Sequence, residues 1–108
     1  MVFIETPVFT KRIATILSDD EYRSLQAELI LQPDKGALIK GGKGLRKVRC
    51  QTKGKGKRGG ARVIYYWFVN DQQIYMVFAY KKNEAENLTP SEVKILAQLV
   101  EEELHEKE

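Results

Sequence analysis

Cysteine is almost absent from this chain of 108 residues, which contains Cys50 and no other. One cysteine cannot form a disulfide within the chain, and a small domain without that cross-link suits a reducing cytoplasm. Long apolar runs are also absent, because none exceeds residues 63–69 and a membrane span requires roughly 20 apolar residues. The first residues lack the basic and apolar segments of a signal peptide. We therefore expect one cytoplasmic domain over residues 1–108, without a membrane partner.

The residue sets of common hydrolases and metal sites are absent too. The chain has a single histidine, His105, and no Ser/His/Asp set, glutamate pair or Cys/His cluster. We expect no metal ion and no cofactor, and nothing in the chain supports catalysis through a covalent enzyme intermediate. Such a protein can still cleave RNA, since RNA carries its own nucleophile in the 2′-hydroxyl group.

Charge is abundant but unevenly placed around a net value of +3. Residues 40–62 contain ten basic side chains and no acidic one, whereas residues 91–108 contain six glutamates and two lysines. A basic block beside an acidic tail indicates a polyanionic partner, and the usual role of such a block is to bind phosphate groups. Phosphate binding is therefore the first function that the sequence predicts. The basic block consists of Lys40, Lys43, Arg46, Lys47, Arg49, Lys53, Lys55, Lys57, Arg58 and Arg62.

Hydrophobic spacing predicts an α+β fold. Ser18 and Glu21 form a capping-box pattern at the start of a helix, and residues 89–92 repeat this signal. Two runs of β-branched and aromatic residues, 62–69 and 74–80, flank a turn and predict a hairpin. We expect an antiparallel-type sheet, with two N-terminal helices and one C-terminal helix packed on one face. The expected order is a strand at 2–4, helices within 9–17 and 18–33, a loop at 32–44, strands at 45–51, 62–69 and 74–80, and a helix from 89.

A glycine-rich run at residues 54–59 allows several interpretations. It matches the dinucleotide pattern G-x-G-x-x-G, but a strand follows where that motif requires a helix. It is not a P-loop, because Arg58 stands where a P-loop has serine or threonine. One alternative is a solvated hairpin loop; the other is a flexible cationic loop that closes on a nucleic-acid backbone. Basic residues on both flanking strands favour the second.

Three basic side chains can converge on one face of the predicted sheet. Lys47 and Arg49 are two residues apart, so they point to the same side of a regular strand. Arg62 opens an apolar strand, and it either joins them or is an ordinary surface arginine at the strand end. Cations do not cluster for stability, because each raises the cost of charging the next. An anionic substrate is the simplest explanation of such a cluster.

The same segments resemble the RelE/HigB toxin superfamily, and its HigB-like branch most. The similarity lies in residues 44–49 (GLRKVR), 54–66 (GKGKRGGARVIYY), 80–84 (YKKNE) and 88–89, and it extends over nearly the whole chain. Members are toxins of type II toxin–antitoxin modules that enter the ribosomal A site and cleave the mRNA there without a metal ion. The resemblance implies a compact microbial-RNase-like fold. The implied partners are the ribosome, mRNA and a HigA-like antitoxin with a helix-turn-helix domain. The toxin would contact operator DNA only through this antitoxin.

The resemblance also assigns roles to individual residues. It implies that Arg62 stabilises the phosphate at the cleavage point. Lys47 and Arg49 on the preceding strand, with Lys82 or Lys81 after the last strand, then complete the site. We interpret the remaining cations as RNA-binding residues. They are Arg46, Lys53, Lys55, Lys57, Arg58 and Lys81.

The expected reaction is an attack of one 2′-hydroxyl on its own 3′-phosphate, which leaves a cyclic phosphate and a free 5′-hydroxyl. Arg62 and Arg49 neutralise the charge of the transition state, while the ribosome orients the RNA. RelE has a tyrosine after the last strand that helps to activate the hydroxyl, whereas no tyrosine follows Tyr80 here. An arginine cannot accept the proton, so Lys47 is the first candidate for the general base and Lys82 for the proton donor.

Two other classes of protein fit parts of the sequence. A non-catalytic RNA-binding or ribosome-associated module would use the same basic block but would not cleave RNA. A DNA-binding regulator would present a basic recognition helix. It ranks third, because the basic residues here lie on predicted strands and a loop, and the last helix is acidic.

Overall fold

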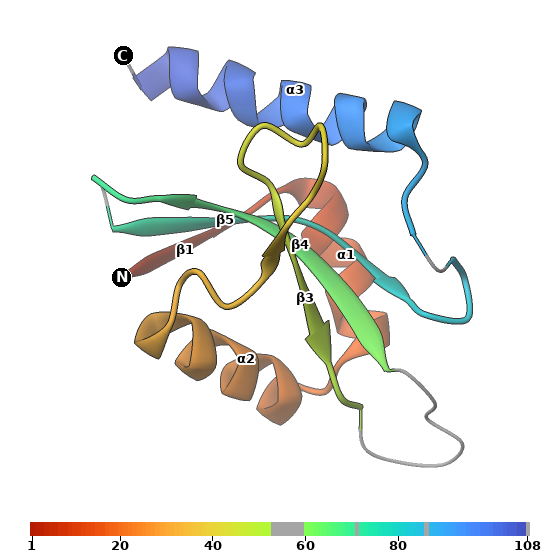
Figure 1. Cartoon of the computed structure of the whole chain (residues 1–108). Helices are drawn as coiled ribbons and strands as arrows, with labels where there is room; N and C mark the ends of the chain where they lie inside the picture. The colour runs from red at the N-terminus through yellow and green to blue at the C-terminus, as the bar shows by residue number, and fades with distance from the viewer. Residues whose placement is uncertain (53–59, 71, 86, 108) are drawn as a thin grey trace.

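The computed structural model describes residues 1–52, 60–70, 72–85 and 87–107, and in this part of the chain three helices and five strands form one α+β fold (Figure 1). The fold class predicted from the sequence is confirmed. No helix within these ranges is long and apolar enough to cross a membrane. In chain order the elements are β1 (Val2–Glu5), α1 (Pro7–Ile16), α2 (Asp19–Leu31), β2 (Ala37–Leu38), β3 (Arg46–Cys50), β4 (Ala61–Phe68), β5 (Gln73–Lys81) and α3 (Pro90–Lys107).

The strands form one mixed sheet in the order β1-β5-β4-β3-β2. The predicted hairpin of β4 and β5 is present, and β3 and β2 continue the antiparallel pairing. β1 instead pairs parallel with β5, so the first strand of the chain lies beside the last. β2 falls in the segment predicted as loop, because two residues are too few to show an alternating pattern.

Helices cover both faces of the sheet, and the expectation that they pack on one face was wrong. Figure 1 shows α3 on one side of the sheet and α1 and α2 on the other. Val63 and Tyr65 of β4 pack in the core beneath α1 and α2, whereas Ile64 and Phe68 pack beneath α3. A strand between two layers of helix is buried on both faces and therefore apolar throughout. The uninterrupted apolar run at 63–69 was the signal for this arrangement.

Local hydrogen bonds explain where the helices begin. The hydroxyl of Ser18 accepts a bond from the amide of Glu21 at 3.1 Å, and the carboxylate of Glu21 accepts one from the amide of Ser18 at 2.7 Å. Thr89 and Glu92 make the same reciprocal pair, at 3.2 and 2.8 Å. Both predicted capping boxes are confirmed. Each provides hydrogen-bond partners for amide groups that the start of a helix leaves unpaired.

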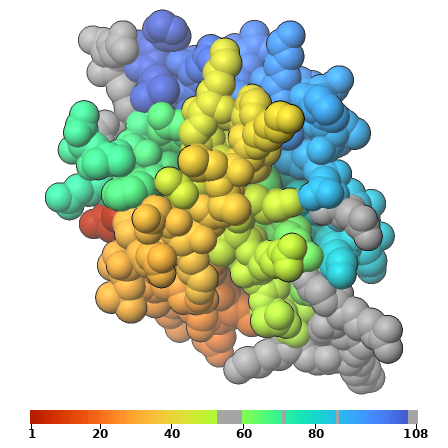
Figure 2. Space-filling view, viewed as in Figure 1, coloured from red at the N-terminus to blue at the C-terminus, as the bar shows by residue number. Residues whose placement is uncertain are grey.

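The segment between β2 and β3, drawn in yellow, extends to α3 (Figure 2). The amine of Lys43 lies 2.8 Å from the carboxylate of Glu101 on α3. Gly44 has a φ of +103°, and a Cβ there would lie 2.6 Å from the ring of Tyr66. The close approach therefore requires glycine. This segment and α3 together cover the sheet face that carries the residues of the next section.

Candidate active site

A cross-strand row of three residues forms the centre of the candidate site. Arg49 of β3 lies directly opposite Arg62 of β4, and Arg62 lies directly opposite Tyr80 of β5. Directly opposite residues in antiparallel strands have Cβ atoms about 4.5–5.5 Å apart, on the same face of the sheet. That face is the one covered by α3, because Tyr80 packs with Leu96 of that helix. We call Arg49 and Arg62 the cationic row, and Tyr80 lies at its end.

Lys47 extends the cationic row by one position. It pairs with Ile64, which packs beneath α3, so it shares a face with Arg49 and Arg62. Its amine donates a hydrogen bond of 2.7 Å to the side-chain oxygen of Asn87, in the segment before α3. The structure thus brings together the three cations that the sequence singled out. Asn87 was not predicted, because it lies 40 residues from Lys47 and no local pattern marks it.

Arg62 is nearly enclosed. Its exposed fraction is 5%, and no other charged side chain in the described part of the chain is buried. One of its terminal nitrogens, Nη1, lies 3.3 Å from the carbonyl oxygen of Ala61. The alternative of an ordinary surface arginine at the strand end is therefore excluded. Enclosing a guanidinium is costly unless its donors are satisfied, so Arg62 is held inside the fold by its surroundings.

Tyr80 lies at the end of the cationic row, next to Arg62, and is uncharged. Its exposed fraction is 2%, and among the described residues its hydroxyl has no hydrogen-bond partner. Burial raises the pKa of Tyr80; the positive charge of Arg62 opposes this shift and the negative charge of Glu92 adds to it. The phenol therefore stays protonated at neutral pH. Tyr80 had no predicted role, since unpaired buried hydroxyl groups have no signature in sequence.

The other predicted site residues are spread more widely. Lys82 is exposed, and its amide donates a bond of 3.1 Å to Gly60, which keeps it beside the start of β4. Lys81 is also exposed but lies opposite Ala61, on the face of α1 and α2. Arg46 lies on that face as well, and its Nη1 donates to the carbonyl oxygens of residues 34 and 36, at 3.2 and 2.8 Å. Lys53, Lys55, Lys57 and Arg58 lie outside the described residues.

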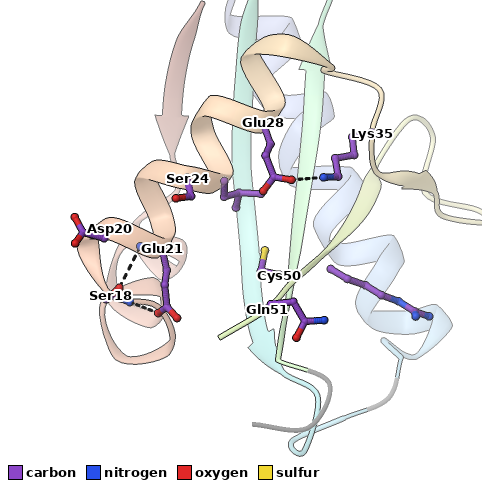
Figure 3. A pocket seen from close by; sticks show the side chains of 10 residues that line it. Ser18, Asp20, Glu21, Ser24, Glu28, Lys35, Cys50 and Gln51 are labelled. Carbon is purple, nitrogen blue, oxygen red and sulfur yellow. Dashed lines mark hydrogen bonds and ion pairs between the residues drawn. The ribbon is translucent and has the colours of Figure 1, made fainter. Parts of the chain in front are cut away.

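A hollow of about 500 Å³ lies between α2 and the end of β3 (Figure 3). β2 pairs with β3 only at Arg46 and Lys47, so Arg49 lies at an open edge of the sheet and lines the hollow from there. Ser24 and Glu28 line it from the helix, where Glu28 pairs with Lys35. Cys50 also lines the hollow. Burial raises the pKa of the Cys50 thiol to about 12, and the nearby charge of Glu28 adds to the shift. The thiol therefore stays protonated and is not an activated nucleophile.

Comparison with known proteins identifies the family. A family model described as the RelE toxin of the RelE/RelB toxin–antitoxin system matches residues 28–108. The chain belongs to the RelE toxin family. Its fold is similar to that of the E. coli toxin RelE, solved as a double mutant in the free state, with a TM-score of 0.56 at 13% sequence identity. The similarity covers 79% of this chain and 86% of that chain.

At this level of identity the structural similarity shows the fold alone, and the predicted RelE-like architecture is confirmed. The family match implies that this RelE-family toxin has an antitoxin as a partner. The matched residues start near the end of α2 and include all the predicted site residues, from Arg46 to Lys82. The roles of these residues stay predictions.

Proposed function

We propose that this RelE-family toxin is a metal-independent endoribonuclease that cleaves mRNA in the ribosomal A site and thereby stops translation. The observation that carries the proposal is the cationic row, in which Arg49 and Arg62 lie opposite each other and Lys47 lies beside them. Two arginines that lie opposite each other on a sheet can bind a phosphate group and stabilise the negative charge that it gains during cleavage. We further propose that residues 1–108 act as one cytoplasmic domain of the HigB-like branch.

The proposed reaction uses the RNA's own 2′-hydroxyl. Its oxygen bonds to the adjacent phosphorus while the bond to the 5′-oxygen of the next nucleotide breaks, which gives a 2′,3′-cyclic phosphate and a 5′-hydroxyl. Arg62 and Arg49 stabilise the charge on the phosphate oxygens in the transition state. The ribosome holds the 2′-hydroxyl in line with the leaving oxygen, and this supplies the orientation.

Lys47 is the proposed general base, and Lys82 is the proposed proton donor to the leaving oxygen. The hydrogen bond of Lys47 to Asn87 is compatible with this role, because a neutral amine still has two N–H groups to donate. With one N–H directed at Asn87, the lone pair of Lys47 is restricted to the remaining directions. The proton that leaves the 2′-hydroxyl goes to Lys47, and the 5′-oxygen receives one from Lys82.

The proposed partners are the ribosome, mRNA and a HigA-like antitoxin. The remaining cations, which include Arg46 and Lys81, would hold the RNA backbone. We propose that the antitoxin carries a helix-turn-helix domain and that the toxin reaches operator DNA only through it. A short helix-turn-helix protein encoded beside this chain would support that assignment.

The decisive experiment compares RNA cleavage with and without ribosomes. The purified protein is first treated with EDTA and dialysed, or left untreated, and is then mixed in a magnesium buffer with an mRNA that is either free or placed in the A site of programmed ribosomes. We expect cuts within codons on ribosomes, with cyclic-phosphate and 5′-hydroxyl ends, at the same rate for the EDTA-treated and the untreated protein. Equal cutting of free RNA would contradict ribosome dependence. Binding to ribosomes without any cutting would favour the non-catalytic RNA-binding module instead.

A further inference from the structure

Three buried or half-buried tyrosines differ in the hydrogen bonds that their hydroxyl groups make. Tyr65 is fully enclosed, and its hydroxyl accepts a bond from the amide of Gly36 at 2.8 Å and donates one to Pro33 at 2.7 Å. Tyr22 donates to the carboxylate of Glu5 at 2.6 Å. The hydroxyl of Tyr80 is enclosed as well, yet within the described residues it has no hydrogen-bond partner.

A buried hydroxyl group without a hydrogen-bond partner lowers stability, and phenylalanine at the same position would not have this effect. Nearly all buried polar groups in proteins have a hydrogen-bond partner, because removing them from water without one lowers stability. The ring of Tyr80 packs in the core beneath α3 with Leu96 and Ala97, and a phenylalanine ring would fill the same space. Packing therefore accounts for the aromatic ring at position 80 but not for its hydroxyl.

The position of Tyr80 indicates what the hydroxyl serves. Tyr80 lies directly opposite Arg62, which in turn lies opposite Arg49, so a phosphate group held over Arg62 has an arginine on one side and this tyrosine on the other. The charge of Arg62 acts on the phenol of Tyr80, as the pKa of Tyr80 reflects. Arg62 itself has an exposed fraction of only 5%, so RNA can engage it only if this part of the site opens. Tyr80, which lies directly opposite with an exposed fraction of 2%, needs the same opening to meet RNA.

We propose that the Tyr80 hydroxyl is a catalytic hydrogen-bond donor to the scissile phosphate of the RNA, acting beside Arg62; this inference rests on the proposed function. The phenol donates to a non-bridging phosphate oxygen, and the bond strengthens as negative charge builds on that oxygen in the transition state. The proton stays on Tyr80, which acts as a donor and not as the general base. Among the residues that the structure describes this donor has no partner, and bound RNA supplies an acceptor.

The test is the Tyr80→Phe variant, with Tyr66→Phe as the matched control. Tyr66 is a half-buried tyrosine on the same face, near the opposite end of β4. Cleavage on programmed ribosomes is measured at saturating and at limiting ribosome concentration, together with urea unfolding of each protein. We expect Tyr80→Phe to cut about 10- to 100-fold more slowly at saturation, with an unchanged half-saturation concentration, because the lost bond forms mainly in the transition state. We expect its unfolding midpoint to be equal to or higher than that of wild type, and Tyr66→Phe to cut at the wild-type rate.

Each other outcome overturns a defined part of the argument. If wild type cuts on ribosomes and Tyr80→Phe cuts at the same rate, the inference about Tyr80 is wrong and the proposed function stands. If Tyr80→Phe is slower but also unfolds at lower urea, the hydroxyl is structural and the inference is equally wrong. If wild type does not cut on ribosomes at all, the proposed function fails, and the role of Tyr80 fails with it.

Discussion

Arg49 and Arg62 lie directly opposite each other on β3 and β4, so two side chains of the same charge occupy one cross-strand pair. Like charges in such a position destabilise a sheet. Arg62 is in addition nearly enclosed, with little water to screen its charge. The pairing of two like charges therefore opposes folding at this point, and under the proposed function a phosphate group bound beside the two guanidinium groups would offset this repulsion.

Replacing Arg49 by glutamine should raise stability and lower activity together. Loss of one like charge should increase the free energy of unfolding by roughly 0.2–1 kcal/mol, and the gain should shrink as salt screens the pair. Cleavage on ribosomes should fall, because one charge partner of the transition state is lost. Urea unfolding at low and high salt and a cleavage assay measure both effects. Lys11→Gln removes an exposed charge from α1 and serves as the control; equal gains in both variants would show that only net charge matters.

Arg62→Ala should abolish toxicity. Loss of a charge partner in the transition state costs roughly 10²–10³ in rate, or about 3–4 kcal/mol. The measurement is growth of bacteria that express wild type or variant at equal protein level, with the folded state of the variant checked by urea unfolding. That check matters because the side chain is enclosed, so its removal can also lower stability. A folded variant that still arrests growth would make Arg62 a scaffold residue.

Asn87→Asp should slow cleavage and move its pH dependence. A carboxylate beside the amine of Lys47 favours the protonated amine, so less of Lys47 can accept a proton at neutral pH. If Lys47 is the general base, the rate should reach half its maximum at a higher pH than in wild type. The pH–rate profile of both proteins on ribosomes provides the measurement. An unchanged profile would leave Lys47 as a phosphate ligand only. Asn87→Ala, which adds no charge, is the control.

Tyr65→Phe should destabilise the protein, in contrast to Tyr80→Phe. The Tyr65 hydroxyl bonds the amide of Gly36 and the carbonyl of Pro33, and its removal leaves both groups without this partner. We expect a loss of about 1–3 kcal/mol in the free energy of unfolding, measured by urea denaturation. A loss of similar size in Tyr80→Phe would show that packing at the two rings, and not hydrogen bonding, decides stability.

Binding of the antitoxin should resist salt better than binding of the ribosome. A toxin that arrests growth must be held at nanomolar dissociation constants or tighter, about −12 kcal/mol, which requires an apolar anchor as well as charge. Charge alone is screened at cellular salt, where the Debye length is about 8 Å. We expect the antitoxin complex to persist at about 0.5 M salt, where contacts of the basic block with RNA weaken steeply. Paired salt titrations measure both; equally steep slopes would mean that the antitoxin is a purely acidic mimic of RNA.

The features that the sequence determined by itself are those fixed by residues close together in the chain. The capping boxes of Ser18 and Thr89 each close over three residues, so they were predictable and lie where expected. Strand alternation likewise placed Lys47 and Arg49 on one side, because side chains in a strand repeat every second residue. The motifs around Arg62 identified the family, which the match over residues 28–108 confirmed.

Tertiary structure alone decided which of these segments meet. The parallel pairing of β1 with β5, and the placement of α3 opposite α1 and α2, depend on burying two apolar faces at once. Lys47 reaches Asn87 across 40 residues, and Tyr80 reaches the cationic row only through the register of β4 and β5. Alternation along one strand says which side a residue faces but not which residue it faces across the sheet. That register is set by the packing of the whole domain, because a shift by one residue would move every apolar side chain of a strand to the wrong face.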